Sequence, residues 1–158
     1  MRGFAAIGLL RPKTPENVGG VLRAAGIYGA SMVAIEGMRA PWVKHSTNTA
    51  KAHRHLPVLS VDHLLDARPY GAQVVVVDLI EGARPLPRFT HPEQAFYLFG
   101  PEDGTLGRRH TARAQHVVYV PGESCMNLAA AVNVVLYDRM VKRGEWANKN
   151  LELQGAGR

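Results

Sequence analysis

The sequence predicts an α/β fold with a mainly parallel sheet that has helices on both faces. Apolar stretches of strand length alternate with helical patterns along the 158 residues, an order typical of βαβ units. Val74 to Val77 is a continuous β-branched run, as expected of a central parallel strand buried on both sides. Polar turns with Gly or Pro follow three of the apolar stretches, at the strand ends where open α/β sheets bind ligands.

The expected elements follow from these patterns. A first helix is opened by the polar run at Thr14-Pro15 and ends before Gly29. The last helix has an apolar face broader than one sheet requires, which indicates a second partner such as another subunit. Residues 1–144 are expected to form a single domain, and residues 145–158 a flexible tail. Strands are predicted at 5–10, 32–35, 73–79, 95–99 and 117–120, and helices at 17–28, 61–67, 105–114 and 128–143.

The net charge of +6 favours an anionic partner. Basic residues gather in two segments, which we expect at the rim of the sheet, where they would neutralise phosphates without reading base sequence. Solvated surface charge is the alternative for either segment. The first contains Arg39, Lys44, His45, Lys51, His53, Arg54 and His55, and the second Arg108, Arg109, His110 and Arg113.

Other classes of protein are disfavoured. The chain has one cysteine, which fits a reducing cytoplasm, and no apolar run near the ~20 residues of a membrane helix. The apolar run from Gly3 to Leu10 reads as a strand and not as a signal peptide. No metal site is expected, because His53 and His55 lie in a basic stretch without other ligands. A nicotinamide enzyme would need a Gly-x-Gly-x-x-Gly motif after the first strand, and Leu10 to Gly20 has none.

The first polar turn opens a helix that carries Asn17 and Arg23. Six residues separate them, so on a helix they point about 120° apart and would flank a groove. Gly19 and Gly20 each cost about 1 kcal/mol relative to Ala in a helix, which indicates close packing at this point. An ordinary capped helix with a solvated arginine is the alternative.

Two further turns have a similar character. Glu102 follows the strand that ends at Phe99, where its carboxylate would point into a cleft, although a solvated acidic turn is the alternative. The stretch from Val120 to Asn127 runs from a strand through Pro-Gly and small polar residues into an Ala/Val-rich helix. Such a junction gathers backbone N–H and C=O groups at one exposed point, where they can hold a polar cofactor.

In this order the three turns resemble the three motifs of the SpoU family, within the SPOUT class of S-adenosylmethionine-dependent RNA methyltransferases. The resemblance covers about Ala5 to Val141. Cys125 stands where the family usually has Ser, and the third motif is a few residues shorter than expected. The matching residues are Asn17, Gly19 and Arg23; Phe99, Gly100, Pro101, Glu102, Gly104 and Leu106; and Val120, Pro121, Cys125, Met126 and Asn127.

The resemblance implies a trefoil knot from about Ala95 to the last helix, and a homodimer with S-adenosylmethionine held near the subunit interface. By the same resemblance, Arg23 acts on a ribose 2′-hydroxyl, and Asn17, Glu102 and Asn127 orient Arg23 and the ribose. Because a guanidinium stays protonated, we interpret Arg23 as a group that binds phosphate and stabilises the developing alkoxide. The cofactor-binding residues implied are Leu79, Gly100, Val120, Cys125 and Met126.

RNA is the implied substrate. Compact members of the family include enzymes that methylate the wobble ribose of tRNA, so tRNA is favoured over rRNA. We expect the catalytic domain itself to recognise the RNA, since the chain carries no additional RNA-binding domain. Two alternatives stay open, namely a base methyltransferase that uses Cys125 as a covalent nucleophile and an RNA-binding module of the same fold without catalysis.

Overall fold

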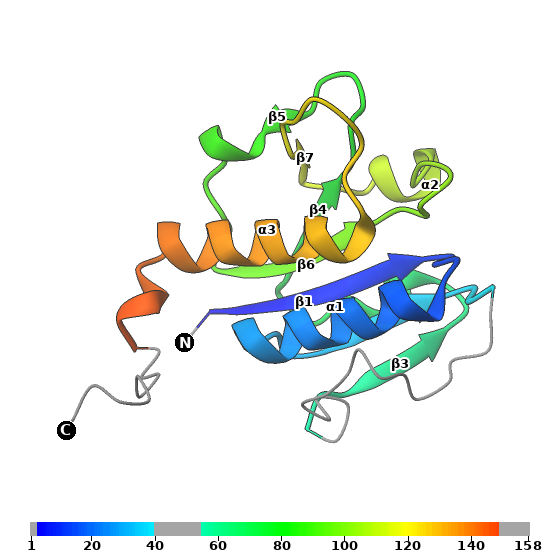
Figure 1. The fold of residues 1–158 in the computed structure, drawn as a ribbon, viewed down its shortest axis with the longest axis horizontal. Coiled ribbons are helices and arrows are strands. Elements are labelled where there is room, and N and C mark those ends of the chain that lie inside the picture. Colours follow the sequence, from blue (N-terminus) through cyan, green and yellow to red (C-terminus); the bar gives the residue numbers. More distant parts are fainter. Residues whose placement is uncertain (1–2, 40–54, 149–158) are drawn as a thin grey trace.

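The computed structural model describes residues 3–39 and 55–148. They form a seven-stranded, wholly parallel sheet in the order β3-β2-β1-β6-β4-β7-β5 (Figure 1). The predicted α/β class with a parallel sheet is therefore confirmed. The elements are β1 (Phe4–Leu10), α1 (Pro15–Tyr28), β2 (Val33–Glu36), β3 (Val58–Val61), η2 (Leu64–Ala67), β4 (Gln73–Val77), β5 (Arg84–Pro85), η3 (Leu86–Arg88), β6 (Gln94–Phe99), α2 (Arg108–Thr111), β7 (His116–Tyr119), α3 (Leu128–Lys142) and η4 (Glu145–Asn148).

The central strands end in register at one edge of the sheet. Phe99 of β6 lies opposite both Leu9 of β1 and Val77 of β4, and Val77 lies opposite Val118 of β7. All strand pairs are parallel, so the segments that follow these strands emerge at the same edge. This register places the three predicted polar turns close together.

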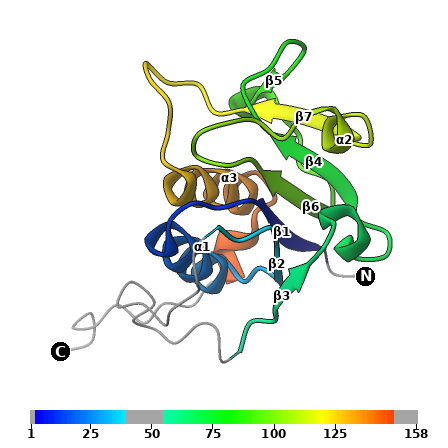
Figure 2. The same cartoon turned by 90° about the vertical axis from the view of Figure 1, so that its right-hand side faces the viewer.

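Helices cover both faces, but unequally. Figure 2 shows α1 and α3 side by side on one face, and the short α2 and η2 on the other. The first face buries Ile7, Leu9 and Tyr97 under the two long helices. The opposite face buries Phe96 and Leu98 against Leu64 and Leu106. The predicted helix over 61–67 is wrong at its start, because Val61 ends β3 and only Leu64–Ala67 is helical.

The predicted bounds of one helix and the predicted number of strands also need correction. The helix expected at 105–114 is confined to Arg108–Thr111, because Gly107 before it has a positive φ of 73°, which a helix cannot contain. The two edge strands β3 and β5 were not predicted; β3 is partly exposed and β5 has only two residues. The predicted tail is described only at its start, where Glu145–Asn148 form a 3₁₀ helix, and residues 149–158 lie outside the described part.

The close packing expected around the first-turn glycines of α1 is present. A Cβ atom on Gly20 would lie 2.8 Å from the Cβ of Ala129 in the first turn of α3. The absence of a side chain therefore lets the start of α1 approach the start of α3. This contact brings Asn17 and Asn127, one at each helix start, within reach of each other.

A buried arginine fixes α3 to the sheet. Arg139 is 3% exposed and donates to the backbone carbonyls of Pro92, Glu93 and Phe4 at 2.6, 2.7 and 3.1 Å. The chain leaves β7 and returns through the long 120–127 segment to pack α3 across β1 and β6 (Figure 2). This path is compatible with the knot, which stays a prediction. In the described ranges, no helix is long and apolar enough to cross a lipid bilayer.

Candidate active site

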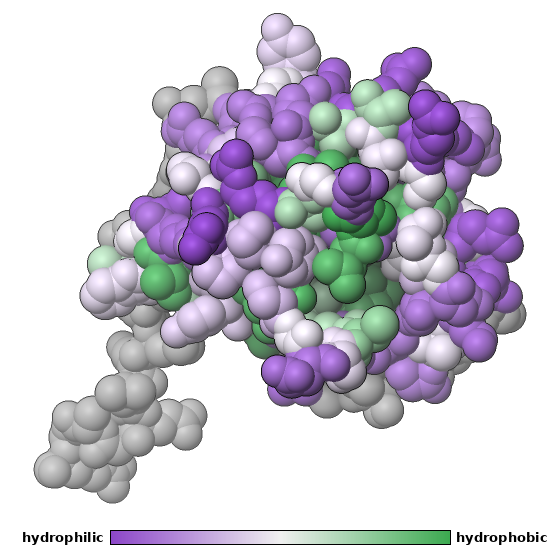
Figure 3. Space-filling view, turned by 90° about the horizontal axis from the view of Figure 1, so that it is seen from above, coloured by the Kyte–Doolittle hydropathy of each residue, from purple (hydrophilic) through white to green (hydrophobic). Residues whose placement is uncertain are grey.

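The three polar turns enclose a cavity at the carboxyl-end edge of the sheet. Its volume of about 760 Å³ suits a small organic ligand. Figure 3 looks onto this part of the molecule and shows hydrophobic surface in a hollow framed by hydrophilic residues. The lining residues are Asn17, Val77, Asp78, Leu79, Phe99, Gly100, Pro101, Glu102, Gly104, Ala131 and the continuous stretch from Tyr119 to Leu128.

A chain of side-chain hydrogen bonds crosses the cavity edge, and its direction is set by α3. Asn127 caps this helix, since its Oδ1 accepts from the backbone N–H groups of Ala129 and Ala130 at 2.9 and 3.2 Å. Its Nδ2 therefore faces away from the helix and donates to Asn17 Oδ1 at 2.8 Å. Asn17 Nδ2 in turn donates to Glu102 Oε1 at 2.8 Å. Each amide orientation follows from the previous one.

Glu102 ends this chain as an acceptor on both oxygens. The backbone N–H of Lys13 donates to its Oε2 at 2.9 Å, and an Arg39 nitrogen lies 3.9 Å from the same oxygen. Burial acts to raise the pKa of Glu102, but hydrogen bonds from Asn17 and from backbone N–H groups outweigh it, so the net pKa is lowered. The hydrogen bonds thus favour the ionised carboxylate and hold it in one orientation, which distinguishes Glu102 from a solvated acidic residue.

Arg39 was predicted to bind phosphate, but in the structure it pairs with Asp103. Its Nη1 and Nη2 donate to Asp103 Oδ2 and Oδ1 at 2.9 and 2.8 Å, and its Nε donates to the Arg11 carbonyl at 3.1 Å. The hydrogen bond raises the pKa of Arg39 and lowers that of Asp103, so both stay charged. Arg39 therefore positions the turn that carries Glu102, and its charge is already compensated. Most of its predicted cluster, residues 40–54, lies outside the described part.

The backbone next to the Arg39–Asp103 pair is strained. Arg11 has φ 46°, the one positive value for a non-glycine among the described residues. Its N–H donates to the Glu36 carbonyl at 2.7 Å, and a Cβ on Gly37 would lie 3.1 Å from Arg11 Cγ. The turns after β1 and β2 therefore fit tightly against each other. Such strain concentrates at functional sites.

Gly100 has a steric reason to be glycine. A Cβ there would lie 3.2 Å from the Leu106 nitrogen and 3.3 Å from the Thr105 carbonyl carbon. The Leu106 N–H donates to Asp78 Oδ2 at 3.2 Å, which holds this returning segment against the end of β4. Asp78 also lines the cavity and was missed by sequence reasoning, although its place directly after a buried strand could have indicated it.

All five predicted cofactor-binding residues line the cavity. Leu79 and Met126 leave 75% and 42% of their surface exposed, so the cavity offers open apolar area. Val120 and Gly100 contribute at the ends of β7 and β6. Cys125 is exposed and has a free thiol. The clustering agrees with the sequence prediction, while the role of each residue stays a prediction.

The charges around the cavity have one sign. Its described lining residues include the carboxylates of Asp78, Glu102 and Glu123, and no Lys, Arg or His. Such a lining favours a ligand with positive charge and disfavours a phosphate. In residues 3–39 and 55–148, no set of three or more His, Cys, Asp or Glu side chains is arranged to hold a metal ion.

Arg23 is the one predicted site residue that lies apart from the cavity. It is exposed on α1, about 9 Å along the helix axis from Asn17, and its side chain makes no hydrogen bond or ion pair with the described part of the chain. The structure therefore gathers Asn17, Glu102 and Asn127 but leaves Arg23 on the open surface beside them. This agrees with the predicted angular separation of Asn17 and Arg23.

Comparison with known proteins identifies the class. The profile of the SpoU rRNA Methylase family matches residues 5–137, and the chain belongs to this family. No curated protein matches the sequence.

Solved structures share the fold. The SpoU methyltransferase AviRb from Streptomyces viridochromogenes has a TM-score of 0.79 at 20% identity, over 92% of this chain and 62% of its own. An AdoMet-bound rRNA methyltransferase from Sinorhizobium meliloti has a TM-score of 0.78 at 23% identity, over 89% and 57%. This chain thus spans about three fifths of their length. A third structure, concerned with 2-OH methylation of C/U34 on tRNA, has a TM-score of 0.75 at 25% identity, over 91% and 93%.

Proposed function

We propose that this protein is an S-adenosylmethionine-dependent RNA methyltransferase that modifies a ribose 2′-hydroxyl, preferably in tRNA. The observation that carries the proposal is the cavity at the meeting point of the three family motifs, with the Asn127–Asn17–Glu102 hydrogen bonds at its edge. Family membership supports the reaction class.

The cavity residues fit S-adenosylmethionine. This molecule carries positive charge on its sulfonium and ammonium groups, which suits a lining with three carboxylates and no cation among the described residues. The apolar surfaces of Leu79 and Met126 suit the flat adenine ring, and backbone groups at Gly100 and Val120 would read its polar edge. When bound, the cofactor supplies an electrophilic methyl group.

The chain's own residues would then align the accepting hydroxyl and exclude water. Asn17, Asn127 and Glu102 are fixed by mutual hydrogen bonds and would orient the ribose at the cavity mouth. The exposed Arg23 is free to bind an RNA phosphate and to stabilise negative charge on the ribose oxygen. The hydroxyl proton would pass to a neighbouring phosphate or to water, because no arginine can accept it.

Incubation with methyl-labelled S-adenosylmethionine and separate tRNA and rRNA pools tests the proposal. Label should enter tRNA, and mass-spectrometric mapping should place it on a 2′-oxygen. Label confined to rRNA would mean that rRNA is the substrate. Label on a base would mean that the enzyme is a base methyltransferase. If calorimetry detects RNA binding but no S-adenosylmethionine binding, the protein is an RNA-binding module without catalysis.

The preference for tRNA is supported by one of the solved structures. The structure concerned with 2-OH methylation of C/U34 on tRNA is covered over 93% of its length by this chain, compared with 62% and 57% for AviRb and the rRNA methyltransferase. The match to the structure concerned with tRNA therefore extends over nearly the whole of that structure.

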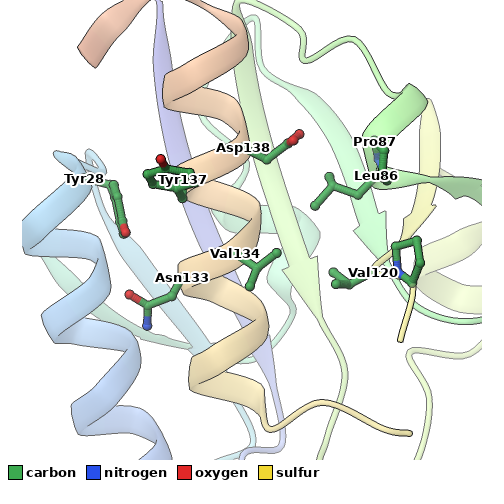
Figure 4. Close-up of a pocket in the computed structure, with 9 residues that line it drawn as sticks. Tyr28, Leu86, Pro87, Val120, Asn133, Val134, Tyr137 and Asp138 are labelled. Atoms are coloured by element: carbon green, nitrogen blue, oxygen red, sulfur yellow. The ribbon is translucent and has the colours of Figure 1, made fainter. Parts of the chain in front are cut away.

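A homodimer is the expected assembly. α3 buries Val132 and Val135 against the sheet but leaves Val134, Tyr137 and Val141 exposed by 36, 56 and 44%. Val134 and Tyr137 border an apolar cavity of about 480 Å³, in which Val134 points toward Val120 and Tyr137 lies beside Tyr28 (Figure 4). The cavity shares Val120 and Pro121 with the proposed active site, so a subunit docked there would support the cofactor cavity.

Light scattering should accordingly report twice the chain mass of 17.2 kDa. Tyr137→Glu is expected to yield a monomer, because a carboxylate would be buried in an apolar interface. Tyr70→Glu is the matched control, since Tyr70 is fully exposed on the turn before β4 and should leave the dimer intact. A wild-type monomer at micromolar concentration would contradict the interface.

Cys125 is expected to be dispensable as a nucleophile. Direct transfer to a hydroxyl needs no covalent enzyme–RNA step, so Cys125→Ser should keep most of the activity. Alkylation of the exposed thiol should block activity by filling the cavity, and prior binding of S-adenosylmethionine should slow it. An inactive Cys125→Ser enzyme, together with a trapped wild-type adduct with RNA, would instead indicate base methylation.

A further inference from the structure

The basic cluster after the Glu102 turn divides into two parts with different surroundings. α2 carries Arg108, Arg109 and His110, and Arg113 follows two residues after the helix. In sequence the four residues form a single positive segment. In the structure two of them are used to hold the fold together, and two are left open.

His110 and Arg109 are the structural pair. His110 is 3% exposed, with Nδ1 2.9 Å from the Leu106 carbonyl oxygen and Nε2 3.4 Å from Glu36 Oε2. An Arg109 nitrogen lies 3.5 Å from Glu36 Oε1 and contacts the His63 ring. Glu36 also accepts from the Leu64 N–H at 2.8 Å. These contacts pin α2 to the ends of β2 and β3 and occupy both carboxylate oxygens of Glu36.

Arg108 and Arg113 are the open pair. Both are exposed, and the side chain of neither makes a hydrogen bond or an ion pair within residues 3–39 and 55–148. Arg108 begins the helix and Arg113 follows it, so the contacts of Arg109 and His110 fix the backbone from which both unpartnered side chains extend.

Arg108 stands close to the cavity along the chain, whereas Arg113 lies farther from it, two residues before Gln115, whose N–H donates to the Val74 carbonyl near the start of β4 at 3.0 Å. Gly104 lines the cavity, Leu106 donates to the lining residue Asp78 at 3.2 Å, and Arg108 begins α2 two residues later. The cavity lining itself has three carboxylates and no described cation. A polyanion would therefore be repelled from the cavity and attracted to the neighbouring α2 edge.

We propose that Arg108 and Arg113 bind backbone phosphates of the RNA substrate and guide its target ribose to the cavity mouth, whereas Arg109 and His110 only support α2. The inference rests on the proposed function and deepens it by assigning the RNA path. Phosphate contacts of this kind position a strand without reading its bases. The α2 edge would thus add affinity and register to a site that recognises the nucleotide elsewhere.

The experiment measures binding of an unmodified tRNA transcript with C or U at position 34, the nucleotides named for the tRNA-acting structure, over a range of salt concentrations. Arg108→Ala and Arg113→Ala should each reduce the slope of log affinity against log salt by about 0.7–0.9. Both should raise KM for tRNA and leave kcat at saturation and S-adenosylmethionine affinity unchanged. Arg109→Ala should lower the melting temperature without changing the slope.

Arg68→Ala is the matched control, because the Arg68 side chain is also exposed and makes no hydrogen bond or ion pair with the described part of the chain, but Arg68 lies between η2 and β4, in a segment that contributes no residue to the cavity lining. It should leave both slope and KM unchanged. Unchanged slopes for Arg108→Ala and Arg113→Ala in an enzyme that still methylates RNA would overturn this RNA path and leave the proposed function intact. A wild-type protein that binds no S-adenosylmethionine would overturn both.

Discussion

Arg23→Ala is expected to abolish RNA methylation and to leave S-adenosylmethionine affinity within a few-fold of the wild type. Arg23 lies outside the cavity, so its loss removes no contact to the cofactor. It would remove the cation proposed to stabilise charge on the ribose oxygen, and loss of one such group typically lowers kcat by about 10²–10³. Single-turnover methylation and calorimetry together measure the two effects.

Arg23→Lys should also fail, because an ammonium cannot reproduce the planar fork of a guanidinium. Arg68→Ala serves as a control for the loss of one exposed positive charge, and it should methylate normally. If Arg23→Ala lowers cofactor affinity as much as it lowers the rate, Arg23 does not have the role proposed for it.

The sequence predicted the centre of the fold better than its edges. The β-branched run of β4 and the apolar runs of β1 and β6 are buried on both sides, so their composition reports their place directly. β3 was missed because its residues are partly exposed at the sheet edge, and a helix was assigned over its last residue. β5 has two residues, too few for any periodicity.

The site, like the fold, was predictable only where a local sequence pattern reports the position of a residue. The three turns were recognisable because each follows a strand, and parallel strands end at the same edge. The partners within the site were not recognisable. Arg39 and Asp103 are 64 residues apart in sequence, and Asn17 and Asn127 are 110 apart. A local pattern placed Arg39 among phosphate-binding residues, because charge composition does not reveal which cations already have a carboxylate.

Cavity charge is also a property of the assembled fold. Asp78, Glu102 and Glu123 follow or lie near the ends of three different strands, and none of them is unusual in its own segment. Only their convergence, without a described cation in the lining, indicates a ligand with positive charge. The same convergence separates the place of the cofactor from the place of the RNA backbone.

Glu102→Gln should therefore lower methylation strongly, by about 10²-fold if it displaces the ribose-orienting amides by about 1 Å. The α3 N-terminus fixes Asn127, Asn127 fixes Asn17, and Asn17 then presents a donor to position 102. Lys13 presents a second donor to the same side chain. A glutamine has only one acceptor oxygen, so its NH₂ group must face one of these donors, and the hydrogen-bonded chain is broken at that point.

The neighbouring carboxylate provides the matched control. Asp103→Asn also replaces an acidic oxygen by an NH₂ group on the same turn, but Asp103 faces only Arg39 and lies outside the cavity lining. Its effect should be no more than a few-fold, since an asparagine oxygen still accepts from the guanidinium. The two variants should have similar melting temperatures and very different values of kcat. Equal losses in both would mean that Glu102 acts only by shaping the turn, because the hydrogen-bonded chain through Asn17 is the feature that distinguishes the two side chains.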